Sequence, residues 1–238
     1  MKRLKFLGFA LFLGVSFLNA CPSYCLTLSG IRTLTRTLVN DSGTSRRRFS
    51  DSQLNTWINE AQRQVSARTY CIEISTSFEL VSGTTYYPTR TDFLHVRRLT
   101  YKFFELPETT PAALDGRTTI WETSKGGPIN YFVRFSSRNM IGFVPFPNAS
   151  TDTGTIRMDF YAHATSLSAD ADVPFNGINE LTSYHESLAF YAAGIAAAID
   201  GRTDIAGLYF QRYETTIKLM EERCRARPNY TPGLTGSR

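Results

Sequence analysis

The chain has 238 residues, which is long enough to bury most of its apolar surface in one large domain or two small ones. A chain of this length does not require disulfide bonds to stabilise its fold. The 26 Lys and Arg residues against 21 Asp and Glu residues give a net charge of +5, which permits binding to nucleic acid but does not require it.

Residues 1–25 resemble a leader. A basic start, an apolar run from Phe6 to Leu18 and small residues before Cys21 follow the plan of a secretory signal, and the residues that end at Cys21 resemble a bacterial lipoprotein cleavage box. The run is too short for a transmembrane helix, which needs about 20 apolar residues. Two interpretations stay open: an exported chain that carries lipid at Cys21, or an upstream extension of a chain that functionally opens near Leu26.

Two amphipathic helices are predicted next. Apolar residues recur at helical spacing from Leu28 to Val39. Ser50 and Gln53 form a capping box, in which each side chain satisfies a backbone N–H of the first turn, so the second helix is predicted to begin at Asp51. The apolar stripe of this second helix consists of Leu54, Trp57, Ile58, Ala61 and Val65.

The middle of the chain, residues 71–170, is predicted to form an antiparallel β domain. The apolar period changes to two after Cys71, and Ser82–Gly83 offers a turn between the run that ends at Leu80 and a following Thr-Thr-Tyr-Tyr run, which predicts a hairpin. Several short strands at this spacing are typical of a β-sandwich or a small barrel. The further predicted strands are residues 93–101, 118–123, 130–135, 140–146 and 154–164.

A second helical stretch follows a polar linker at residues 166–177. Two rows of residues repeat every seven positions there and predict one continuous packing seam. The rows are Leu181, Leu188 and Ile195, and His185, Ala192 and Ile199. Asp200–Gly201 is predicted to end this helix, Thr203 to begin another, and Pro228 to close it. We predict that the stripe of the second helix packs against Leu181, Leu188 and Ile195 in the same chain.

No sequence motif for catalysis or cofactor binding is found. The chain lacks G-x-S-x-G, G-x-x-x-x-G-K-[ST], G-x-G-x-x-G and H-E-x-x-H. His95, His163 and His185 are far apart in the sequence, and scattered carboxylates are usually solvated rather than catalytic. Residues 123–128 lack the following helix of a phosphate-binding loop and are interpreted as a hairpin turn. We therefore expect no catalytic residue, no cofactor and no metal.

The four cysteines are Cys21, Cys25, Cys71 and Cys224. They show no C-x-x-C spacing, and no group of histidines lies near enough in the sequence to complete a zinc site. Free or buried thiols are the expectation, because free cysteine usually behaves as a small apolar residue. A bridge between Cys71 and Cys224 stays open.

Three basic clusters are candidates for contact with phosphate or with an acidic protein surface. They are Arg46 to Arg48, Arg97 with Arg98, and Arg223, Arg225 and Arg227. Solvated charge is the simpler interpretation of each cluster. Adjacent residues of a strand point to opposite faces, so Arg97 and Arg98 are not expected to line one groove.

Four segments stand in a fixed order along the chain: FSDSQLNTWINEAQRQVSART, LVSGTTYYPTRTDFLHVRRLTY, FVPFPNASTDTGTIRMDFYAHATSLSADADVP and HESLAFYAAGIAAAIDGRTDIAGLYFQRYETTI. Together they resemble the head-to-tail adaptor, or connector, proteins that complete the heads of tailed bacteriophages. The resemblance runs from about Leu26 to Met220, nearly the whole chain.

The resemblance implies an α+β fold in which N- and C-terminal helices, residues 26–70 and 171–226, form a helical bundle. The β domain, residues 71–170, is then inserted between them as a sandwich or barrel, and residues 227–238 form an extended tail. In this family the C-terminal segment commonly reaches the portal, which gives Arg223, Arg225, Arg227 and Tyr230 an expected portal-binding role.

The resemblance also implies a structural, non-enzymatic protein of the virion neck that is assembled in the host cytoplasm. The expected assembly is a ring of identical subunits, a dodecamer, beneath the portal protein and above tail or nozzle proteins. Double-stranded DNA would pass through its lumen without sequence-specific binding. The alternative is an exported bacterial lipoprotein, anchored at Cys21 in the envelope, with a β-sandwich binding module.

Overall fold

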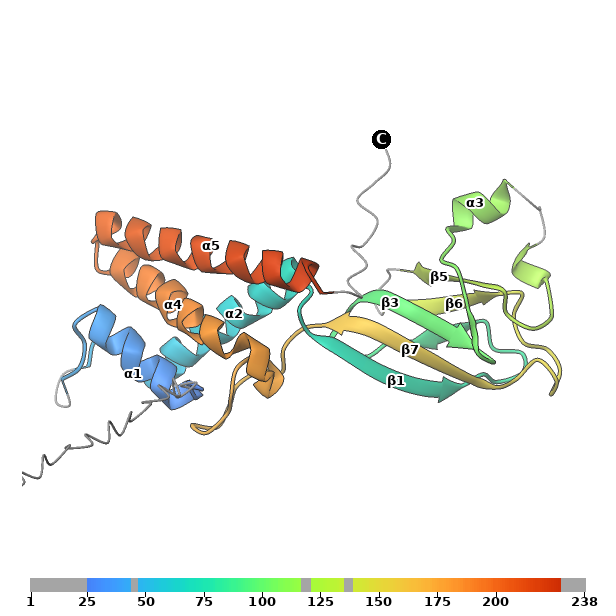
Figure 1. The fold of residues 1–238 in the computed structure, drawn as a ribbon, viewed down its shortest axis with the longest axis horizontal. Coiled ribbons are helices and arrows are strands. Elements are labelled where there is room, and N and C mark those ends of the chain that lie inside the picture. The colour runs from blue at the N-terminus through green and yellow to red at the C-terminus, as the bar shows by residue number, and fades with distance from the viewer. Residues whose placement is uncertain (1–24, 44–46, 117–120, 135–138, 228–238) are drawn as a thin grey trace, which may run out of the picture.

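The fold of the chain is α+β. The computed structural model describes residues 25–43, 47–116, 121–134 and 139–227. Figure 1 shows long helices gathered at one end of an elongated molecule and two small sheets at the other. Of the helices in these ranges, none is both long and apolar enough to cross a membrane.

Two helices open the described chain, α1 (Leu28–Leu38) and α2 (Asp51–Thr69). The side chain of Ser50 accepts a hydrogen bond from the N–H of Gln53, and the side chain of Gln53 accepts one from the N–H of Ser50. The predicted capping box and the predicted start of α2 are therefore confirmed. α2 is capped at its C-terminal end by Tyr70, which adopts a left-handed backbone conformation with φ of 50°.

A buried arginine ties α1 to the start of α2. Arg36, on the last turn of α1, donates to Asp41 at 2.8 Å, to the carbonyl of Phe49 at 2.9 Å and to Asp51 at 2.7 Å. Both Arg36 and Asp41 are buried, and Asp41 also accepts from the N–H groups of Arg48 and Phe49, so these contacts together replace the hydrogen bonds that the two charges have lost to water. This contact fixes the loop between the two helices.

Two further helices close the chain, α4 (His185–Ile199) and α5 (Thr203–Arg225). α4 contacts α1, α2 and α5, and alanines on several of its sides are buried, as expected of a central helix. Gly201, with φ of +75°, ends α4 as the sequence predicts. The α4–α5 contact is close, because the ring of Phe210 lies directly against the backbone of Gly194.

The predicted seam on α4 is only partly continuous. Leu181 lies in a short 3₁₀ helix, η3 (Asn179–Tyr184), rather than in α4, although its side chain is buried. Ile199, the last residue of the second row, is 62% exposed. The prediction was wrong at these ends, because a seven-residue repeat drifts around a straight helix and α4 ends at Ile199.

The strands form two antiparallel sheets. The first sheet has the order β1-β7-β3-β4 and the second has the order β2-β6-β5. The strands of the first sheet are β1 (Glu73–Glu79), β7 (Thr155–Ala162), β3 (Phe93–Tyr101) and β4 (Phe104–Glu105). Those of the second are β2 (Tyr86–Pro88), β6 (Met140–Val144) and β5 (Asn130–Arg134). Rings from both sheets meet between them, with Phe78 and Tyr87 centred 5.3 Å apart.

The predicted hairpin after Cys71 was wrong. The chain does turn at Gly83, which has φ of +80°, but β1 pairs with β7 and β2 pairs with β6. The turn therefore carries the chain from one sheet to the other. The physical reason is that the side-chain alternation of a strand specifies its faces and leaves its partner strand unspecified.

The strand predicted at residues 118–123 is also wrong where it can be seen. Residues 121–123 form a 3₁₀ helix, η1 (Trp121–Thr123), and residues 118–120 lie outside the described part. Trp121 is buried, donates from Nε1 to Asp115 at 2.7 Å and packs on Phe132, so tertiary contacts override the strand tendency of the segment. Asp115 ends a short helix, α3 (Pro111–Asp115).

Residues 123–128 do not form the expected hairpin turn. The segment follows η1 rather than a strand, and Lys125 forms an isolated parallel bridge with Phe146.

The polar linker, residues 166–177, is irregular up to a 3₁₀ turn, η2 (Phe175–Gly177). It is held to α2 by side chains that bond its backbone: Asn59 bonds Leu167, at 2.7 and 2.9 Å, and Gln62 accepts from the N–H of Phe175 at 2.9 Å.

Candidate functional site

Except for Ile195, the residues predicted to pack between α2 and the late helices lie in or against one apolar core. Most of them are at most 1% exposed, and α2 and α4 contact each other. The buried members are Leu54, Ile58, Ala61, Val65, Leu181 and Leu188. Ile195 and Trp57 are half-buried.

Trp57 lies at the edge of the core. Its ring meets Phe49 edge to face, with ring centres 5.5 Å apart. On its outer side it lines a groove of about 840 Å³ between α2 and the loops that precede β3 and follow β7, together with Arg90 and His163. Charged side chains in the groove are paired, since Arg63 binds Glu60 and Arg90 binds Asp92.

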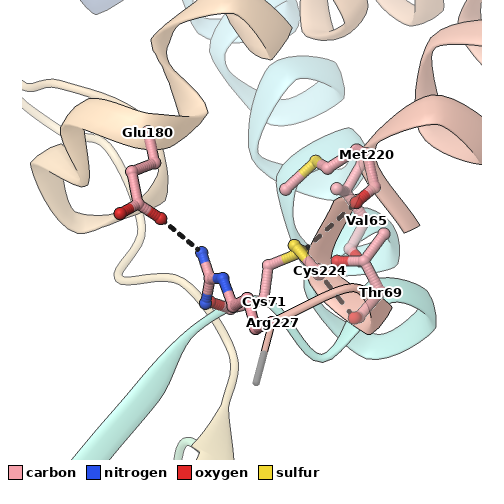
Figure 2. The surroundings of a disulfide bond; sticks show 7 residues. All are labelled: Val65, Thr69, Cys71, Glu180, Met220, Cys224 and Arg227. Atoms are coloured by element: carbon pink, nitrogen blue, oxygen red, sulfur yellow. Dashed lines mark hydrogen bonds and ion pairs between the residues drawn. A yellow bond between two sulfur atoms is a disulfide. The ribbon is translucent and has the colours of Figure 1, made fainter. Parts of the chain in front are cut away.

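The end of α5 meets the base of the first sheet through a disulfide (Figure 2). Cys71, two residues before β1, is bonded to Cys224 in the last turn of α5, and their Cα atoms are 5.6 Å apart. Both residues are buried, at 0% and 1% exposure. The bridge that the sequence left open is therefore present, between residues separated by 153 positions, and the expectation of free thiols is wrong for these two cysteines.

Arg227 adds a second contact at the same place. Its guanidinium donates to the carbonyl oxygen of Cys71 at 3.0 Å and to the carboxylate of Glu180 at 3.2 Å (Figure 2). It therefore joins the residues that follow α5 both to the base of β1 and to η3. Tyr230, expected from the resemblance to bind the portal, lies outside the described residues.

The other two arginines of the C-terminal cluster differ in their surroundings. Arg225 is paired with Glu221, one turn earlier on α5. Arg223 is exposed, and its side chain makes no ion pair or hydrogen bond with any residue that the structure describes. Arg223 is thus the member of the cluster whose charge remains most available.

A second ion pair joins α2 to α5 near the same end. Arg68 donates two parallel hydrogen bonds, each of 2.8 Å, to the two carboxylate oxygens of Glu214. These bonds lower the pKa of the Glu214 carboxyl and raise the pKa of the Arg68 guanidinium from their usual values. Both side chains are more than one-third exposed, so water screens the attraction.

The described arginines of the N-terminal cluster form ion pairs within the chain. Arg48 is paired with Asp200 and donates to the carbonyl of Val39 at 2.8 Å, so it joins the α1–α2 loop to the end of α4. Arg47 lies 3.7 Å from Asp51, and Arg46 is outside the described ranges. Arg48 is therefore paired within the chain, although its side chain is still 44% exposed to water.

Arg97 and Arg98 lie on the same face of the first sheet, which corrects the expectation that they point apart. The pairing of β3 with β7 shifts register between Val96 and Arg98, the sign of a β-bulge. A bulge interrupts the alternation of side chains, so Arg97 reaches Glu73 at 2.7 Å while Arg98 lies 3.4 Å from Glu105. The sequence gives no signal for this bulge.

The sequence patterns did not identify exposed apolar side chains as a candidate site, although the sequence shows that these residues are apolar. Leu208 and Leu219, both more than half exposed, lie on one outer face of α5. Phe103 and Phe104, at 101% and 75% exposure, form the tip of the β3–β4 hairpin. Large apolar groups left in water often mark contact surfaces for other proteins.

The chemistry of the described residues is that of packing and charge pairing. Within those ranges, no group of three His, Cys, Asp or Glu side chains is placed to hold a metal. His185 is buried against Phe175, and neither of its ring nitrogens has a hydrogen-bond partner there. Burial lowers the pKa of His185 to about 4.

Comparison with known proteins identifies the family. A search of the curated proteins finds no match to this chain. The model of the family described as SU10 adaptor protein matches residues 26–234, which includes the helices, both sheets and the bridged end of α5. On this match over most of its length, the chain belongs to the SU10 adaptor protein family, a family of structural bacteriophage proteins.

Proposed function

We propose that the protein is a ring-forming head-to-tail adaptor that binds beneath the portal, extends the DNA channel and connects the capsid to the tail. The observation that carries this proposal is the family match over residues 26–234. Membership of a phage adaptor family supports a location in the virion neck and contacts with portal and tail proteins. The proposed ring is a dodecamer through which double-stranded DNA passes without base recognition.

In this proposal, residues 26–70 and 171–226 are the helical adaptor core, and residues 71–170 are a β-sandwich inserted into it. Packing of α4 against α1, α2 and α5 supports a shared helical core. Aromatic contacts between the sheets, such as Phe78 with Phe143, support the face-to-face arrangement. Residues 1–25 precede the matched region, and residues 227–238 form the tail.

The outer face of α5 is our candidate for the contact between ring neighbours. Leu208 and Leu219 are eleven residues apart, which returns to the same side of an α-helix after three turns. Thr215 lies between them on this face and adds little charge or bulk. Burial of these leucines by a neighbour would remove apolar surface from water and stabilise the ring.

The basic end of the chain is our candidate for the portal contact. Arg223 presents an available charge, whereas Arg225 and Arg227 are already paired with Glu221 and Glu180. Arg223 would therefore contribute first to binding an acidic portal surface, with Arg225, Arg227 and Tyr230 contributing as the tail folds on its partner.

Native mass spectrometry of the purified protein, alone and mixed with the phage's portal ring, tests the proposal. We expect twelve copies bound to one portal ring. The double variant Leu208→Lys/Leu219→Lys should fold but lose the ring, while Gln211→Lys, an exposed change on the same helix, should keep it. A chain that stays monomeric in the presence of the portal would refute the adaptor role.

The N-terminal pattern supports a second candidate, a lipoprotein anchored at Cys21 in a bacterial envelope. The basic start, the apolar run from Phe6 to Leu18 and the cysteine are its basis. Intact mass measurement of the chain from expressing cells decides this point. A mass that includes lipid on Cys21 would support the lipoprotein, and an unmodified Cys21 in assembled particles would exclude it.

A further inference from the structure

We infer that Cys71 and Cys224 form a redox-controlled latch, a thiol pair whose oxidation by a small-molecule disulfide fixes the end of α5 to the base of β1. The latch lies where three segments converge: the end of α2, the residues that enter β1 and the last turn of α5. The chain leaves this point toward residues 228–238. The latch is a property of this chain alone, and only the timing of its closure rests on the proposed function.

The last turn of α5 has few other apolar anchors. The buried residues along this helix are Ala206, Tyr213, Ile217, Met220 and Cys224. Cys224 is thus the last of them, and the residues after it are exposed except for Arg227. A covalent bond at Cys224 therefore restrains the turn that the core holds least.

The surroundings also accommodate the reduced pair. Cys71 Sγ lies 3.7 Å from the carbonyl oxygen of Thr69 and 3.9 Å from that of Met220 (Figure 2). A disulfide sulfur has no proton to donate, but a thiol at the same position would find these two weak acceptors. Since a thiol is also well suited to an apolar site, reduction removes the bond without leaving a buried polar group unsatisfied.

Access to the pair is gated by the end of α5. Both sulfurs belong to residues that are at most 1% exposed, so a reagent reaches them only when the last turn opens. Arg227 crosses the same place through Cys71 and Glu180, and both of its contacts are hydrogen bonds that can break and re-form. Oxidation adds to these reversible hydrogen bonds a covalent bond that persists until it is reduced.

The chemistry balances with glutathione disulfide as the oxidant. One cysteine thiolate attacks a sulfur of glutathione disulfide, forms a mixed disulfide and releases one glutathione thiolate. The second cysteine thiolate attacks the protein sulfur of that mixed disulfide and releases the other. Two protein thiols are oxidised to one bridge, one glutathione disulfide is reduced to two thiols, and the thiol protons pass to the released glutathione.

The proposed function suggests when closure occurs. A protein assembled in host cytoplasm is kept reduced, and a particle released into the medium meets oxidising conditions. Each subunit would therefore be assembled with an openable α5 end and locked afterwards.

Hydrogen exchange measured by mass spectrometry on the full chain tests the latch. The background variant Cys21→Ser/Cys25→Ser removes the other thiols, including the exposed Cys25. One sample is kept reduced, the other is treated with glutathione disulfide, and a maleimide counts the free thiols of each after unfolding. We expect two labels in the reduced sample and none in the oxidised sample. At labelling times too short for global unfolding, amides of residues 221–227 should exchange about tenfold faster when reduced, and those of α1 should not change.

The variant Cys71→Ala/Cys224→Ala should show the fast exchange under both conditions. If this variant does not fold, the reduced and oxidised samples decide the question, because they have the same sequence. Equal exchange of residues 221–227 in the two samples would overturn the inference. So would glutathione disulfide that yields only mixed or intermolecular disulfides, or exchange that rises equally in α1. None of these results depends on the portal, so failure of the latch and failure of the adaptor role are separable.

Discussion

The contact between Gly194 and Phe210 shows how one missing side chain sets the distance between two helices. A Cβ atom built on Gly194 would lie 2.8 Å from the Phe210 ring, closer than such atoms pack. Gly207, in α5, has open space around its own Cβ position and lies on an exposed surface. These two glycines therefore give a matched pair of substitutions to alanine.

We expect Gly194→Ala to lower the free energy of unfolding by about 1–3 kcal/mol, because the ring must move away from α4. Gly207→Ala should instead raise it by up to about 1 kcal/mol, since alanine is the better helix former. Urea denaturation followed by circular dichroism measures both. A stabilising effect of Gly194→Ala would mean that the helices are not held at this distance.

His185 should make the stability of the protein depend on pH. Its pKa in the folded state is about 4, below the usual value of 6.5, so the unfolded chain binds a proton first as the pH falls. The contribution of His185 to stability is therefore fully present above about pH 7.5 and decreases as the pH falls through 6.5 toward 4. From pH 8 to pH 5, we expect a loss of about 2 kcal/mol from this residue.

Urea denaturation at pH 8 and pH 5 of the wild type and of His185→Leu isolates this contribution. Carboxylates such as Glu214, whose pKa is lowered, lose their contribution only at more acidic pH and affect both proteins equally. The leucine variant should lose about 2 kcal/mol less than the wild type between the two pH values. Equal losses would show that His185 reaches water in the folded state.

At the scale of elements, the α1–α2 connection depends on the buried pair of Arg36 and Asp41. Arg36→Ala leaves Asp41 buried with weaker support: the N–H groups of Arg48 and Phe49 still donate to it, at 2.8 and 3.4 Å, but the nearest remaining cation, Arg48 Nε, is 4.0 Å away. We expect a loss of about 3–5 kcal/mol in unfolding free energy. Arg63→Ala, which removes an exposed pair with Glu60, should cost less than about 1 kcal/mol and is the control.

The double variant Arg36→Met/Asp41→Leu distinguishes a charge effect from a packing effect. It should recover part of the stability that Arg36→Ala loses, because no buried charge is then left unpaired, although the N–H groups of Arg48 and Phe49 lose Asp41 as their acceptor. Thermal unfolding monitored by circular dichroism provides the comparison. If the double variant is as unstable as the single one, the hydrogen bonds of the pair with the backbone, from Arg36 to the Phe49 carbonyl and from the N–H groups of Arg48 and Phe49 to Asp41, are the dominant contribution.

Elements whose signals are local could be predicted from the sequence, and elements that depend on distant partners could not. Ser50 and Gln53 satisfy the first turn of α2 by themselves, and Gly201 ends α4 by its own conformational freedom, so both boundaries were predictable. Ile74 pairs with Phe160, far along the chain, and its alternation with polar neighbours contains no information about that partner.

The candidate site was predictable to a similar degree. Cys71 and Cys224 are visible as a possible pair, but only the packing of α5 on α2 brings them within bonding distance. The bulge that places Arg97 and Arg98 on one face contains no glycine, so the sequence does not indicate it. Neither the role of Arg227 nor the availability of Arg223 follows from their spacing, because both depend on which carboxylates lie nearby in the fold.

At the scale of the whole molecule, the disulfide should contribute strongly to stability. It closes a loop of about 150 residues. In the chain-entropy model, restricting the unfolded chain in this way adds roughly 4–5 kcal/mol to the free energy of unfolding. We therefore expect the oxidised protein to unfold at a clearly higher urea concentration than the reduced protein. Denaturation with and without a phosphine reductant measures this, and coincident curves would show that the bridge acts only locally.

The same bridge gives the chain an unusual covalent topology. The part of the chain from Cys71 to Cys224, which includes both sheets and α4, forms a closed covalent loop. α1 and α2 precede this loop in the chain and lie outside it. A protease that cuts once within the covalent loop, for example between β6 and β7, opens the loop but releases no fragment. Such a nicked subunit would migrate as one polypeptide until a reductant separated its pieces.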